Sequence, residues 1–144
     1  RYPDILTHRL LSLHLKNEEI SEGAWHEYEA MLRYASEREV LATDAERTSI
    51  KYKQVEYMQN KVGQVFGGVI TGVTEWGIYV EEKETLAEGM VRTRDLKDDL
   101  YVLDEKNYRL CGTNTKKKYS LGDAVQIKLI RADMAKRTLD FAFA

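Results

Sequence analysis

The chain has 144 residues, of which 43% are hydrophobic and 32% charged, and its formal net charge at pH 7 is −2. This composition is typical of a globular protein with one ordinary domain or two very small ones, and it excludes a disordered chain. A net charge near zero also excludes a uniformly basic nucleic-acid-binding protein, so any such surface must be local.

The start of the sequence, its lack of long apolar runs and its cysteine content indicate where the protein belongs. No apolar run is long enough for a transmembrane helix, and the opening Arg1-Tyr2-Pro3-Asp4 does not look like a signal peptide. We therefore expect no membrane partner. The missing initial methionine predicts a piece of a longer protein. Cys111 is the single cysteine, which excludes an internal disulfide and favours the cytoplasm.

Helical periodicity dominates the first part of the chain. Residues 2–16 and 24–35 repeat apolar side chains at helical spacing. Ser36 followed by Glu39 has the form of a capping box and predicts that a third helix begins there and runs to Lys61, with Gly63 as its stop. The apolar stripe of this third helix is thin for its length, so we expect it to pack on a larger body outside this chain.

From Val62 onward the period changes from 3.6 to 2, which divides the chain into residues 1–61 and 62–144. Dense glycines near Gly67 predict a curled first strand, as in a small closed barrel. We predict an α+β protein whose second part is a five-stranded antiparallel OB-fold barrel with an inserted hairpin. The first two barrel strands are expected within 62–81 and the other three at 86–92, 124–132 and 138–143, and the hairpin covers 100–111.

A nucleic-acid surface on such a barrel needs rings that stack on bases and cations that meet phosphates. Trp76 and Tyr79 lie three residues apart at the start of the second strand. They can face outward as a stacking platform or inward as core, and the pattern leaves both alternatives open. Arg92 and Arg137 are expected on strands beside the second strand, where they could flank the rings. The other interpretation is that both are solvated surface charges.

The sequence offers little for catalysis. His8, His14 and His26 lie on helical stretches without metal-ligand spacing, so no metal site is predicted within this chain. Cys111 has no evident base partner. We interpret the run from Lys116 to Lys118 as a solvated loop.

Four motifs of the second part resemble the S1 RNA-binding domain, an OB-fold family. They are Gly63-x-Val65, Trp76-Gly77-Ile78-Tyr79-Val80, Gly89-Met90-Val91-Arg92 and Leu121-Gly122-Asp123. The resemblance implies that Trp76 and Tyr79 stack on RNA. The resemblance also implies that Asp133 and Arg137, in the turn between the last two strands, contact RNA. Arg92 stands where the family usually has histidine, which leaves base preference in doubt, although arginine also stacks and adds a phosphate contact.

The first part resembles the C-terminal end of the catalytic domain of the ribonuclease R and ribonuclease II family. The matching residues are Arg1-Tyr2-Pro3-Asp4, His8-Arg9, Ala45-Glu46-Arg47 and Tyr57-Met58. The resemblance implies a processive 3′-to-5′ exoribonuclease that uses magnesium and releases nucleoside monophosphates. Its metal-binding aspartates would precede Arg1, so this chain alone should be inactive and bind no cofactor. Glu46 matches a glutamate near the active site of that family.

Three functions remain as alternatives. The first is the RNA-binding C-terminal part of such an exoribonuclease, whose partners are single-stranded RNA and the upstream catalytic domain of the same chain. The second is a non-enzymatic adaptor module that binds RNA or a ribosome. The third is a barrel that binds protein through its acidic edge, Glu81 to Glu88.

Overall fold

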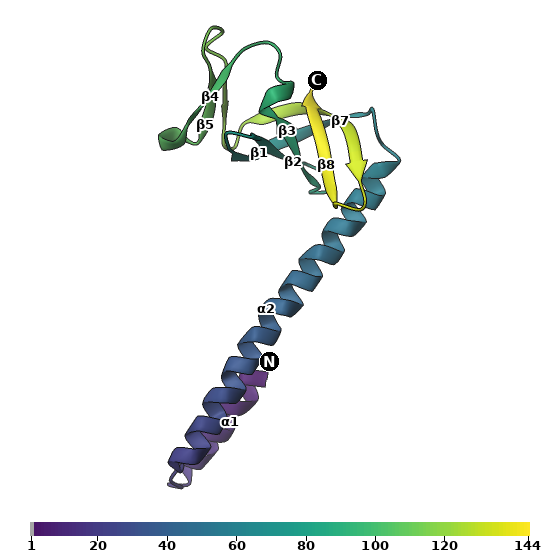
Figure 1. Cartoon of the computed structure of the whole chain (residues 1–144). Coiled ribbons are helices and arrows are strands. Elements are labelled where there is room, and N and C mark those ends of the chain that lie inside the picture. Colours follow the sequence, from purple (N-terminus) through teal and green to yellow (C-terminus); the bar gives the residue numbers. More distant parts are fainter. Residues whose placement is uncertain (1) are drawn as a thin grey trace. The chain divides into compact units, whose positions relative to one another are not determined.

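The computed structural model describes residues 2–144, and their contacts divide the chain into two compact units after Thr48. The first unit contains helix α1, Tyr2–Leu15, and most of helix α2, Glu22–Gln59; the second contains the end of α2 and the strands (Figure 1). The sequence placed the division between residues 61 and 62, where the secondary structure changes. The compact unit begins earlier because Val55 and Met58 of α2 are buried in the core of the barrel.

Helix α2 corrects the prediction of separate second and third helices. It is continuous through Ser36, whose hydroxyl donates to the carbonyl of Leu32 at 3.1 Å and so forms no cap. The N-terminus is capped by Ser21 instead, whose Oγ accepts from the Ala24 N–H at 3.3 Å. The chain leaves the helix through Gly63, whose φ of 91° suits glycine.

Five strands close into a barrel in the order β1-β2-β3-β8-β7, which confirms the predicted OB-fold count (Figure 1). Their bounds are β1 Val65–Val73, β2 Gly77–Glu82, β3 Glu88–Arg92, β7 Ala124–Asp133 and β8 Thr138–Phe143. One pairing differs from the prediction: β3 and β8 run parallel, so the barrel is not antiparallel throughout. β8 pairs with β3 and β7 and not with β2, so the last strand does not lie directly beside the second.

The insertion between β3 and β7 contains the predicted hairpin, formed by the antiparallel pair β4 Tyr101–Asp104 and β5 Arg109–Gly112, and a third strand, β6 Lys118–Ser120, extends it to a three-stranded sheet in the order β4-β5-β6. The basic stretch predicted as a loop thus ends in a strand at Lys118. Short 3-10 turns, η1 Thr93–Asp95 and η2 Glu105–Asn107, precede β4 and separate β4 from β5. Asp99 fixes the loop between β5 and β6, because its carboxylate accepts hydrogen bonds from the N–H of Asn114 at 3.0 Å and from the N–H of Thr115 at 2.6 Å.

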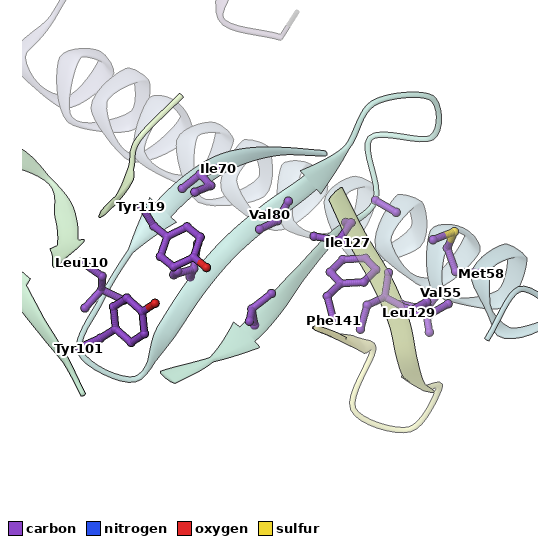
Figure 2. Packing of buried hydrophobic residues seen from close by; sticks show 14 residues of the cluster. Val55, Met58, Ile70, Val80, Tyr101, Leu110, Tyr119, Ile127, Leu129 and Phe141 are labelled. Atoms are coloured by element: carbon purple, nitrogen blue, oxygen red, sulfur yellow. The ribbon is translucent and has the colours of Figure 1, made fainter. Parts of the chain in front are cut away.

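The core runs through the barrel and into the insertion. Figure 2 shows Val55, Met58, Leu129 and Phe141 gathered at one end, and Tyr101, Leu110 and Tyr119 at the other. Alternation along β2 sends Ile78 and Val80 inward and leaves Tyr79 outward. The outward-facing side chains, such as Tyr79, are therefore the ones that can form a binding site on the barrel surface. No helix among residues 2–144 is both long and apolar enough to span a membrane.

Candidate nucleic-acid interface

Trp76 lies in the turn between β1 and β2, and its side chain is 78% exposed. The turn is held without the ring: the Thr74 hydroxyl donates to the Gly77 carbonyl at 2.9 Å, and the Trp76 carbonyl accepts from the Thr93 N–H at 3.0 Å. The backbone is therefore fixed while the indole faces solvent. A large exposed ring on an ordered turn is available for stacking.

Tyr79 points outward from β2, with 37% of its surface exposed. Its Cα partners are Gly72 on β1 and Met90 on β3. The ring leans over Gly72, where an added Cβ would come within 3.3 Å of Tyr79 Cδ2. Neither Trp76 nor Tyr79 belongs to the buried core, so the inward alternative for these rings was wrong.

Arg92 ends β3 opposite Gly77, which has no side chain to cover it. Its Nη2 lies 3.0 Å from both carboxylate oxygens of Asp140 on β8. Asp140 and Tyr79 are both Cα partners of Met90, so one row across the outer face reads Tyr79, Met90, Asp140. A partly buried ion pair thus holds the arginine, which lines the same pocket as Tyr79.

The turn between β7 and β8 contains Asp133 and Arg137. The Asp133 carboxylate accepts from the Lys136 N–H at 3.0 Å and from Arg131 Nη2 at 2.8 Å. The backbone hydrogen bond from Lys136, followed by the Arg131 charge, lowers the pKa of Asp133. Arg137 is exposed at a φ of 55°, in the left-handed region. Asp133 thus shapes the turn that presents Lys136 and Arg137.

The structure brings together only some of the residues expected at the site. Tyr79 and Arg92 line one pocket, with Asp140 beside them, whereas Trp76 and Arg137 lie on turns outside that lining. Glu46 is exposed on α2 in the helical unit, a different compact unit from the other five residues. The RNA-contacting roles of these residues and the active-site role of Glu46 stay predictions.

The same pocket contains residues that were not predicted for the site, among them Lys51, Met90, Lys136 and Asp140. Asp140 had a usable signal, because it alternates with the buried Leu139 and Phe141 and must therefore point outward. Among residues 2–144, no group of three or more His, Cys, Asp or Glu side chains is arranged to hold a metal ion. The geometry therefore combines exposed rings with cations and offers no set of metal ligands.

Comparisons with known proteins agree with this geometry. The model of the S1 RNA binding domain family matches residues 59–143. Ribonuclease R of Aquifex aeolicus is 40% identical over 148 residues, covering 98% of this chain and 20% of the relative. Ribonuclease R of Thermotoga maritima is 36% identical over 146 residues, again covering 98% of this chain and 20% of the relative. The chain thus spans about a fifth of the length of the curated relatives it matches.

Among solved structures, the apo form of Mycoplasma genitalium RNase R is similar to the whole chain, with a TM-score of 0.87 at 23% identity over 23% of its own length. The same enzyme in complex with ribose methylated single-stranded RNA gives the same values. At this identity the likeness concerns the fold, and it extends through the helices as well as the barrel.

Proposed function

This chain belongs to the S1 RNA binding domain family, and on that premise we propose that its barrel binds single-stranded RNA on the outer face of β2, β3 and β8. The observation that carries the proposal is the exposure of Trp76 and Tyr79, together with the anchored Arg92 that lines the same pocket as Tyr79. Stacking on aromatic rings binds bases without reading sequence, and cations bind the backbone.

The parent protein is proposed to be a ribonuclease R-like exoribonuclease that hydrolyses RNA from the 3′ end with magnesium in the cytoplasm. Support comes from relatives that match both the helices and the barrel over 98% of this chain. In this proposal the barrel clamps RNA for a catalytic domain that supplies the metal ligands, and Glu46 lies near its active site. The present chain alone binds RNA and hydrolyses none.

The proposal is tested by titrating a labelled single-stranded RNA with the whole chain at several salt concentrations. We expect saturable binding that weakens as salt rises, because each phosphate contact releases counterions and gives a slope of about −0.7 in log K against log salt. Absence of binding, or an affinity that does not change with salt concentration, would contradict the RNA-binding proposal. RNA shortened by the purified chain in magnesium would contradict its proposed inactivity.

A further inference from the structure

A pocket with a volume of 260 Å³ lies between the end of α2 and the outer face of β3 and β8, within the barrel unit. The residues that matter for its chemistry are Lys51, Tyr79, Met90, Arg92, Lys136 and Asp140. Ligand pockets usually start at about 300 Å³. This pocket is smaller than that, so it can hold only part of a longer ligand, such as one nucleotide of an RNA strand.

Helix α2 is fastened to the barrel where it borders this pocket. Gln54 Nε2 donates to the carbonyls of Thr85 at 3.1 Å and Leu86 at 2.9 Å. Val55 and Met58 are 1% and 0% exposed. Lys51 precedes Val55 by four residues and Met58 by seven, so it continues the helical stripe that faces the barrel. Lys51 is the residue of α2 that lines the pocket.

The cations that line this pocket differ in whether a carboxylate already pairs with them. Lys51 and Lys136 are exposed, and neither makes an ion pair with another residue between Tyr2 and Ala144. Arg92 is instead held by Asp140. The other carboxylate in the lining is Glu88, whose Oε1 accepts from the Thr71 hydroxyl at 3.1 Å. The two lysines are thus the pocket cations that no ion pair holds, although the Asp133 carboxylate lies near enough to Lys136 to feel its charge.

An apolar surface adjoins the lysines in the same pocket. The Tyr79 ring and the Met90 side chain occupy neighbouring positions on β2 and β3. Tyr79 and both lysines line this one pocket, so a nucleotide whose base stacks on the ring can meet the lysines with its phosphate. Ammonium groups bind phosphate as point charges and need no fixed orientation.

We infer that α2 binds RNA directly: Lys51 on the helix and Lys136 on the β7–β8 turn together hold the phosphate of the nucleotide whose base stacks on Tyr79. The inference rests on the proposed function and adds a helical residue to an interface otherwise made by the barrel.

The test compares Lys51→Gln and Lys136→Gln with the control Lys53→Gln in the whole chain. Lys53 lies two residues along the same helix, on a different side, and pairs with Glu56 at 2.7 Å. The probe is labelled oligouridylate, titrated at several salt concentrations. We expect each pocket variant to weaken binding a few-fold at low salt and to reduce the salt slope by about 0.7, as for one lost phosphate contact. Lys53→Gln should leave both unchanged.

Lys51→Arg should retain the wild-type slope, because the positive charge stays, and equal melting temperatures should show that the variants fold. If Lys51→Gln matches Lys53→Gln while Trp76→Ala weakens binding, the inference is overturned and the proposed function stands. Weaker binding with an unchanged slope overturns it as well. If the unmodified chain does not bind the probe, the proposed function fails and the inference falls with it.

Discussion

The helical unit and the barrel unit contain similar apolar side chains but bury them to very different extents. Between Tyr2 and Thr48, Leu6 is the buried hydrophobic residue, whereas Trp25 and Tyr34 are more than half exposed. In the barrel, Ile78 and Ile127 are fully covered. A closed barrel satisfies both its strand edges and its core within one chain. These two helices leave much of their apolar surface exposed, and we propose that the remainder of a ribonuclease R-like chain covers it.

The largest expected effect tests this contrast in burial. Ile78→Ala should lower the free energy of unfolding by about 2–5 kcal/mol, because it leaves a cavity in the barrel core. The matched control is Ile5→Ala on α1, where the side chain is 51% exposed, and it should cost less than about 0.5 kcal/mol. Urea unfolding of both variants measures the difference. Equal losses would mean that the helical unit has a core of its own.

A second prediction concerns Glu82, a charged residue buried inside the barrel unit and 3% exposed. Burial by itself raises the pKa of its carboxyl, but hydrogen bonds from the Thr85 hydroxyl and from the N–H groups of Glu84 and Thr85 outweigh burial and lower it below its ordinary value of 4.5. The ionised form therefore stabilises the fold. This contribution is complete above about pH 4.5, and it is lost as the pH falls through the lowered pKa.

Replacing this carboxylate isolates its contribution. Glu82→Gln should cost about 1–3 kcal/mol at neutral pH, because the negative charge is lost and an NH2 group replaces one of the two oxygens that accept these hydrogen bonds. Urea unfolding of both proteins between neutral and acidic pH should show their stabilities converging as the pH drops. A constant difference at every pH would show that the charge of Glu82 does not stabilise the barrel.

The third prediction separates stacking from folding. Trp76→Ala and Tyr79→Ala should each weaken binding of single-stranded RNA by about 1–3 kcal/mol while changing the free energy of unfolding little, because both rings face solvent. Trp25→Ala, in the helical unit, is the control and should leave RNA affinity unchanged. Fluorescence anisotropy and thermal melting measure the two quantities. Unfolding of the barrel by either ring variant would assign that ring to the core.

The smallest effect is expected for the ion pair on the outer face. Asp140→Asn should change stability by less than about 1 kcal/mol, since both side chains of the pair stay partly exposed to water, which screens their attraction. It should raise RNA affinity at low salt, because a negative charge leaves the binding face and the Arg92 guanidinium is released. Asp104→Asn is the control: it breaks the 2.8 Å pair with Arg109 on the inserted sheet and should not alter RNA affinity. Unchanged affinity for both variants would place Asp140 outside the interface.

Local pattern was sufficient to predict the barrel strands and insufficient to predict the direction in which β3 and β8 pair. Alternation around Ile78 and glycines near Gly67 predicted strands where β1 and β2 lie. The parallel pairing of Val91 with Phe141 joins segments far apart in the sequence, and no local pattern encodes it. β6 was missed because, of its three residues, only Tyr119 is buried.

The helices and the pocket show the same limit. The capping box at Ser36 failed because a continuous helix supplies backbone partners for the groups that a cap would satisfy. Trp76 and Tyr79 could be selected from their spacing, although their direction could not. Lys51 lies at helical spacing from Val55 and Met58. This spacing indicates that Lys51 faces the barrel only once the structure shows that this part of the helix packs on the barrel.

The measurement that tests the central claim most directly is the fluorescence of Trp76 during RNA binding. The chain has two tryptophans, so Trp25→Phe leaves Trp76 as the only one. Oligouridylate should quench this fluorescence saturably, with the same dissociation constant that anisotropy of labelled RNA reports at each salt concentration, because a stacked base contacts the indole directly. RNA binding with no change in Trp76 fluorescence would contradict the claim that the exposed ring face of the barrel is the RNA-binding surface.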